Sequence, residues 1–382
     1  EDDEVDTSFL DCNGTMTVTV TPPTGAAGTF VLDTHGGDSE QGNGGSGGGI
    51  EEQASQETHN SYLMIANTGS VDASCTVPTL SIDLGSVPAT FTANTTVNVV
   101  ASMDEAALAD GTVFLRANDN GLYVWDTTNG VAQRATGLRI AEGATVTLAA
   151  NGYYGPTSIA LSFARDVDVA GTLTTASAGG SKGSLDVSAR QIHFAATSSI
   201  STAGSDFDQS GHVGLNAMQD LVALGHIDTT GPSGTFGQPG QDVFLEADGA
   251  LHVGGTITTV GGAASAGGGG NGGDVNLEAV SRQICNAADI TTDGGDAVGV
   301  AGVGGSIQFA EDCTYGTAVE VRNSGDLRAR GGNETGACSG TCSGGQGGNI
   351  VFIGIGGGAI SSSGSLDTRG GSSENGTSGG GG

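Results

Sequence analysis

The chain has 382 residues, 71 of them glycine and only 7 proline, and its 42 acidic and 11 basic side chains give a formal net charge of −31. Glycine comes in bursts rather than at every third position, which excludes a collagen triple helix. The negative charge argues against nucleic acid and anionic membranes as partners, because phosphate groups are bound by clustered Lys and Arg.

The first residue, Glu1, is not a methionine, and no stretch approaches the roughly 20 apolar residues of a membrane span. We therefore expect a processed, exported chain without a membrane span, either secreted or held at the cell surface. The even number of cysteines, 6, is typical of an oxidising compartment and agrees with this expectation.

The N-terminal segment, residues 1–29, contains one clear strand pattern. In the sequence TMTVTVTP, Met16, Val18 and Val20 alternate with threonine and share one face. A strand of this kind can add to an exposed sheet edge. We therefore interpret residues 1–29 as an N-terminal strand segment that could serve as an assembly arm.

Residues 30–157 form a less regular, β-rich region. Its segment LDTHGGDSEQGNGGSGGG, starting at Leu32, closely mirrors LDTRGGSSENGTSGGGG, starting at Leu366, so the same pattern occurs near both ends of the chain. The stretch MDEAALAD, residues 103–110, is the only passable helix, of one or two turns.

Residues 158–382 contain a repeat with seven copies. Each copy opens with aliphatic residues that alternate with small or polar ones, as in DVFLEA, and carries a second marker such as GTITT 14 to 20 residues later. A short alternating piece lies between the two. The second residues of the seven openings are Ile159, Leu185, Val213, Val243, Val275, Ile307 and Ile350.

A single copy, with three short strands, cannot bury its own apolar face. We therefore predict an all-β fold, a parallel β-solenoid in the form of a right-handed β-helix with three strands per coil and seven regular coils. The Gly-rich stretches, which vary in length, should lie as loops on one edge. The opening residues should form one inward ladder and the anchors of the second marker another, and we expect an outward column of Thr175, Thr202, Thr229, Thr259, Thr292 and Thr368.

The combination of GGDVNLEA with GGTITT resembles the Gly-rich parallel β-helices of secreted bacterial surface proteins, of the filamentous-haemagglutinin or autotransporter-passenger type. The resemblance covers residues 158–382 well and residues 30–157 loosely. It implies an extracellular fibre, adhesin or matrix component, and it transfers no binding residue.

The cysteines are candidates for disulfide bonds. Two of them lie in the motif CSGTC, for which zinc binding is the alternative, but no histidine lies near this motif to complete a zinc site. The sequence does not fix the connectivity. The candidates are Cys12, Cys75, Cys285, Cys313, Cys338 and Cys342.

Candidate catalytic and metal-binding residues are few, and we expect neither an enzyme nor a required cofactor. Asp166 and Asp168 should share an outward strand face beside Arg165, the best arrangement for a polysaccharide lyase or hydrolase. His193 and His252, two coils apart, are too distant to share a metal and should be solvent-facing structural residues. For Ca²⁺, weak oxygen ligands are offered by Asp119, Asp206 and Asp208.

The end of the repeat region shows no cap, so the strands of its last copy, with Ile350, Phe352 and Leu366, should present unpaired backbone groups. We predict a structural protein that polymerises with itself head to tail, by stacking of solenoid ends or by exchange of the N-terminal strand. The alternatives are a secreted adhesin that binds cell-surface glycans and, third, a polysaccharide lyase or hydrolase.

Overall fold

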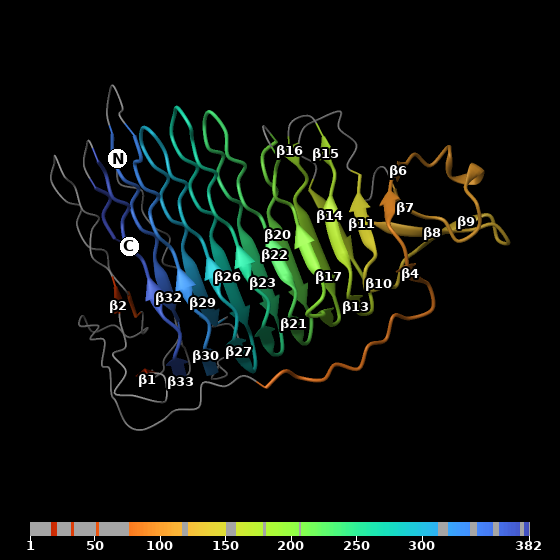
Figure 1. Cartoon of the computed structure of the whole chain (residues 1–382). Helices are drawn as coiled ribbons and strands as arrows, with labels where there is room; N and C mark the ends of the chain where they lie inside the picture. The colour runs from red at the N-terminus through yellow and green to blue at the C-terminus, as the bar shows by residue number, and fades with distance from the viewer. Residues whose placement is uncertain are drawn as a thin grey trace, which may run out of the picture.

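The chain winds into a parallel β-solenoid, and its coils lie side by side along one axis (Figure 1). Three long sheets run along this axis, and neighbouring strands in them are parallel. This confirms the all-β, parallel β-solenoid fold; its right-handedness stays a prediction. The computed structural model describes residues 17–20, 32–33, 51–52, 76–116, 121–149, 158–178, 181–205, 208–311, 320–336, 342–353, 359–374 and 378–381.

Sheet I contains the first strand of each coil from residue 158 onward, together with β3 (Glu51–Glu52) from nearer the N-terminus. The opening residues of the repeats pair in register, from Ile159 with Leu185 to Ile307 with Ile350, and all are buried. They form the predicted inward ladder. The strands follow the order β12 (Ile159–Ser162), β17 (Leu185–Ala189), β20 (Val213–Ala217), β23 (Val243–Ala247), β26 (Val275–Ala279), β29 (Ile307–Glu311), β32 (Ile350–Phe352) and β3 (Glu51–Glu52).

Sheet II contains the second strand of each coil. Its inner face is mostly aliphatic but includes the buried Asn286 and Asn323, whose amides are joined by a 2.7 Å hydrogen bond. The strands follow the order β4 (Pro88–Phe91), β10 (Gly137–Ile140), β13 (Val167–Val169), β18 (Ile192–Phe194), β21 (Leu221–Ala223), β24 (Leu251–Val253), β27 (Gln283–Asn286), β30 (Glu320–Asn323), β33 (Ala359–Ser362) and β1 (Thr17–Val20).

Sheet III contains the third strand of each coil, and its anchors form the second predicted ladder, from Leu173 to Leu366. Sheets II and III begin before residue 158, where the sequence predicted the regular coils to start. The strands follow the order β5 (Thr95–Val97), β11 (Thr145–Leu148), β14 (Thr172–Thr175), β19 (Ser199–Ser201), β22 (His226–Asp228), β25 (Ile257–Thr258), β28 (Ile290–Thr291), β31 (Leu327–Arg328), β34 (Leu366–Asp367) and β2 (Leu32–Asp33).

The expected outward threonine column is wrong, because these threonines point inward. Thr259, for example, is 0 % exposed, and its hydroxyl donates a hydrogen bond of 2.6 Å to the carbonyl of Gly273. Each threonine lies two residues after an inward anchor, and side chains two apart in a strand share a face. The same burial holds for Thr175, Thr202, Thr229, Thr292 and Thr368.

The Gly-rich loops project from one edge of the solenoid (Figure 1). Isolated parallel bridges join neighbouring loops, as between Gly234 and Ala264. A side chain at Gly302 would overlap the carbonyl oxygen of Gly270 in the preceding loop. Glycine thus permits close stacking of backbones here, and these loops belong to the ordered fold.

The first coil of the solenoid is formed by β4 and β5, at the end opposite β1. A small four-stranded sheet, which we call the cap sheet, covers this coil. Its Leu115 and Leu122 join the main core, so it closes that end of the solenoid interior. The predicted short helix is a single 3₁₀ turn beside it, η1 (Glu105–Ala107). The cap sheet comprises β6 (Val99–Val100), β7 (Val113–Arg116), β8 (Leu122–Asp126) and β9 (Val131–Arg134), and a separate antiparallel pair is formed by β15 (Ser177–Ala178) and β16 (Ser181–Lys182).

Candidate assembly interface

The N-terminal strands β1, β2 and β3 add one further coil to the last coil of the repeat region. We call these three strands the arm. Strand β1 pairs with β33, β2 with β34 and β3 with β32, and all three pairings are parallel. Figure 1 shows β1 and β2, in red, beside the blue strands of the C-terminal coils. The edge that the sequence left without a cap is therefore occupied by the chain itself.

The register of the arm continues the ladders of the solenoid. Val18 pairs with Ile360 and Leu32 with Leu366, and both partners in the last coil are buried. Val20 pairs with Ser362, whose hydroxyl accepts a 3.0 Å hydrogen bond from Asn323. The arm therefore occupies the position that the next repeat would take.

Of the predicted assembly residues, the structure brings Val18, Val20, Ile350, Phe352 and Leu366 to this junction. Ile350 and Phe352 of β32 are both buried, and the ring of Phe352 stacks on that of Phe309 with 4.7 Å between centroids. The sixth, Met16, lies outside the described residues.

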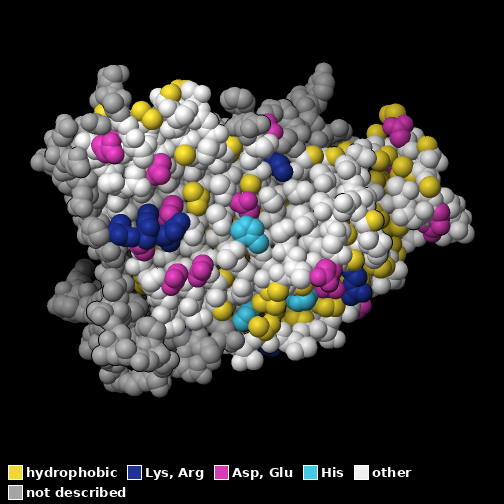
Figure 2. Space-filling model, viewed as in Figure 1, with side chains coloured by type: hydrophobic (Ala, Val, Ile, Leu, Met, Phe, Trp, Pro, Cys, Tyr) yellow, Lys and Arg dark blue, Asp and Glu magenta, His cyan; other side chains and the backbone are white. Residues whose placement is uncertain are grey.

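The outer face of the last coils in sheet III carries a network of ion pairs. Asp367 accepts hydrogen bonds from Arg330 and Arg369, and Arg328 contacts Asp293 at 2.7 Å. Figure 2 shows dark blue and magenta side chains gathered toward this end of the visible face. Burial alone would raise the pKa of Asp367, but hydrogen bonds from Arg369 and Arg330 outweigh it and lower that pKa to about 2.

The described part of the connection between the arm and the first coil begins at residue 76, and Figure 1 shows it in orange along the lower edge of the solenoid. It is pinned at Asp83, whose N–H donates a 2.6 Å hydrogen bond to Asp166. Asp166 is 0 % exposed and also accepts two hydrogen bonds from Arg190, at 2.6 and 2.8 Å. These three residues form an anchor for the connection.

This anchor corrects the catalytic candidate. Asp166 is buried and accepts hydrogen bonds from Asp83 and Arg190, so it is not exposed beside Asp168 as expected. Asp168 lies on the outer face of β13 between His193, at 2.9 Å, and Arg139, at 3.0 Å. The hydrogen bond from His193 is the main cause that lowers the pKa of Asp168. Arg165 instead contacts Asp83 at 3.5 Å.

The histidines do not form a metal site in the described part of the chain, where no group of three or more His, Cys, Asp and Glu could hold an ion. His252 is only 2 % exposed, so its expected exposure to solvent is wrong, and burial lowers its pKa. Of the calcium candidates, Asp119 and Asp206 lie outside the described residues. Asp208 lies near Lys182, where its charge partly offsets the burial that lowers the pKa of this lysine.

Cys285 and Cys342 each take part in a disulfide bond. The other candidates, Cys12, Cys75, Cys313 and Cys338, lie outside the described residues.

Comparison with known families, curated proteins and solved structures finds no match for this chain. The resemblance to bacterial surface β-helices therefore stays a prediction. Among the described residues, no helix has the length and apolar character needed to cross a membrane.

No local sequence signal predicted two structural features, the anchor and the cap sheet. The anchor joins Asp83 to Asp166 and Arg190, which no motif connects. The cap sheet lies in the irregular region, where strand patterns were visible but their arrangement was not. The repeated LDT of residues 32–34 and 366–368 was the one usable signal, because it indicated equivalent positions in two coils.

Proposed function

We propose that the protein is an extracellular structural protein, a subunit of a filament in which each chain gives its arm to the next chain. The pairing of β1, β2 and β3 with β33, β34 and β32 carries the proposal. An arm that closes its own chain can make the same contacts on a second chain. Such a contact joins two different surfaces, so it does not close and it propagates as a filament.

The length of the connection supports exchange. Residues 53–82 supply 30 residues between the arm and the anchored Asp83, and a fully extended chain of this length spans roughly 100 Å. From β13, next to the anchor, to β1 there are seven strand spacings, or roughly 34 Å. The connection is therefore long enough to reach either the chain's own last coil or that of a neighbour.

The cap sheet favours exchange over simple stacking of solenoid ends. Leu115 and Leu122 of the cap sheet fill the core at the first coil, so the bare end of another solenoid cannot stack there on all three sheets, although among the described strands β4 and β5 each keep one unpaired edge. The disulfide-bonded Cys285 and Cys342 support an oxidising, extracellular location. Neither assembly nor this location requires a cofactor or a catalytic site.

The second candidate function is a glycan-binding adhesin. One observation favours it: Phe244 is 44 % exposed on the outer face of sheet I, where its neighbour Gly214 has no side chain. His212 lies edge-on to the ring, with 6.4 Å between centroids. Binding to cell-surface polysaccharide that is lost in Phe244→Ala, with assembly unchanged, would support this candidate.

The filament proposal is tested with the full chain. Below about millimolar concentration, the typical effective concentration of a tethered segment, the arm should close its own chain and give a monomer of 37.2 kDa. Light scattering and negative-stain microscopy should show fibres when the concentration exceeds this range. Monomers at every concentration, including after partial unfolding and refolding, would contradict exchange.

A further inference from the structure

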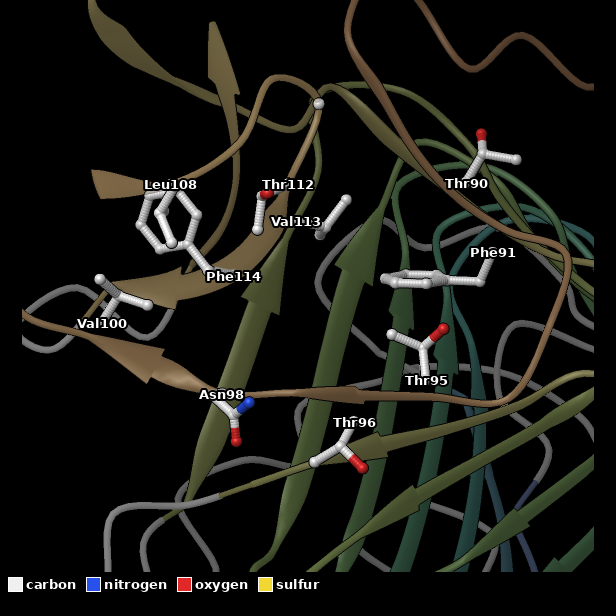
Figure 3. A pocket seen from close by; sticks show the side chains of 11 residues that line it. Thr90, Phe91, Thr95, Thr96, Asn98, Val100, Leu108, Thr112, Val113 and Phe114 are labelled. Atoms are coloured by element: carbon white, nitrogen blue, oxygen red, sulfur yellow. The ribbon is translucent and has the colours of Figure 1, made fainter. Parts of the chain in front are cut away.

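A groove of about 380 Å³ lies between the first coil and the cap sheet (Figure 3). One wall is formed by Thr90 and Phe91 of β4 with Thr96 of β5, and the other by Val113 and Phe114 of β7. None of the described residues that line it is charged. The groove therefore offers apolar side chains together with threonine hydroxyls from both the first coil and the cap-sheet side.

The groove lies at sheet edges with unpaired backbone groups. Among the described strands, β4 pairs only with β10 and β5 only with β11. The carbonyls of Phe91 and Val97 accept hydrogen bonds from the second coil, from Ala141 and Ala149. Because backbone groups alternate in direction along a strand, those of Thr90 and Thr96 point to the unpaired side.

The two ends of the solenoid are complementary in sheets II and III. These sheets begin with β4 and β5 and end with β1 and β2, and all four strands run in the same direction, whereas sheet I begins two coils later with β12. Among the described strands of the closed chain, β1 and β2 each pair on one side only. When the arm is exchanged onto a second chain, it would lie along the solenoid axis directly before β4 and β5 of its own chain, which is also the order of these strands in the sequence.

We propose that this groove receives the outer edge of the exchanged arm. Strands β1 and β2 would then lie between the last coil of a second copy and strands β4 and β5 of their own chain. This inference rests on the proposed arm exchange and adds a contact that the closed chain lacks. Backbone pairing with β4 and β5 is the form of recognition in which a strand extends an exposed sheet edge.

The test uses Thr96, whose side chain is exposed and whose N–H points to the unpaired side. Thr96→Pro removes this donor on the edge that faces away from β11, where proline is tolerated. Thr96→Lys keeps the backbone and places a charge in the groove, and Thr96→Val is the matched control. Circular dichroism and melting temperature establish that each full-length variant folds as the parent does.

We expect Thr96→Pro and Thr96→Lys to raise the critical concentration for fibres about fivefold or more, the change that one net hydrogen bond gives. Thr96→Val should assemble like the parent. If the parent forms fibres and both variants form them equally well, the groove proposal is overturned while arm exchange stands. If the parent forms no fibres at all, the proposed function itself has failed. If Thr96→Pro does not fold, the result for Thr96→Lys decides.

Discussion

Leu32 and Leu366 are parallel partners in β2 and β34, although they come from opposite ends of the chain. Their pairing extends the second ladder of the solenoid by one coil, which the N-terminal arm provides. The arm thus caps the last coil within one chain and, in our proposal, joins it to the next.

The inward position of the threonine column predicts an asymmetry between Thr258 and Thr259. Thr259→Val removes the hydroxyl that donates to the buried Gly273 carbonyl, at almost unchanged volume. We expect a loss of about 1–2 kcal/mol in the free energy of unfolding. Thr258→Val, on the outer face, should change it by less than about 0.5 kcal/mol. Equal effects in urea denaturation would contradict the inward assignment.

Stacking of the Gly-rich loops predicts a position-dependent cost of alanine. A Cβ at Gly302 would overlap the Gly270 carbonyl oxygen, whereas a Cβ at Gly268 would find its nearest neighbour, the Val300 oxygen, at 3.5 Å. Gly302→Ala should therefore destabilise the chain by about 1–3 kcal/mol through overpacking, and Gly268→Ala should be nearly neutral. Thermal unfolding of both variants measures the difference. Two neutral substitutions would show that the loops behave as linkers.

Buried asparagines link the coils of sheet II close to the arm, on β27 and β30, with β33 between β30 and β1. Asn323 donates to the carbonyl of Gly325 at 2.9 Å and to Ser362 at 3.0 Å, and it accepts from Asn286 at 2.7 Å. Asn323→Ala should cost about 2–4 kcal/mol, because buried partners lose their hydrogen bonds. Gln308→Ala, on the outer face of sheet I, serves as the control in denaturant titrations. If Asn323→Ala lowers the free energy of unfolding no more than Gln308→Ala does, these hydrogen bonds do not stabilise the coils.

Much of the solenoid could be predicted from alternation and repetition. The seven openings identified the inward residues from Ile159 to Ile350, because a face repeated at every coil must be the buried one. The outward threonine column was wrong because it followed the polarity of threonine rather than the alternation that places Thr259 on the face of Ile257.

The candidate site was only partly visible in the sequence. Val18 and Leu32 carry the strand pattern, but pairing with Ile360 and Leu366 is a long-range contact that no local pattern encodes. The burial of Asp166 could not be predicted, because it depends on Asp83 and Arg190, which lie far from it along the chain.

Acid should weaken the last coil through Asp367. Its folded pKa of about 2 lies below the reference value of 3.8, so its ion pairs stabilise the fold above about pH 4. This contribution, about 2 kcal/mol, is lost as the pH falls from about 4 to 2. The difference in unfolding free energy between the parent and Asp367→Asn should shrink over this range. A difference that does not change with pH would exclude this role for Asp367.

Cross-linking between chains tests arm exchange most directly. Two full-length variants, Leu32→Cys and Leu366→Cys, carry different tags and are oxidised together at fibre-forming concentration; parallel partners lie within reach of a disulfide bond. The double variant, oxidised when dilute, should link within one chain and serves as the control. We predict covalent products with both tags, joined at positions 32 and 366 by mass spectrometry. A mixture without such products, alongside a double variant that links internally, would show that the arm only closes its own chain.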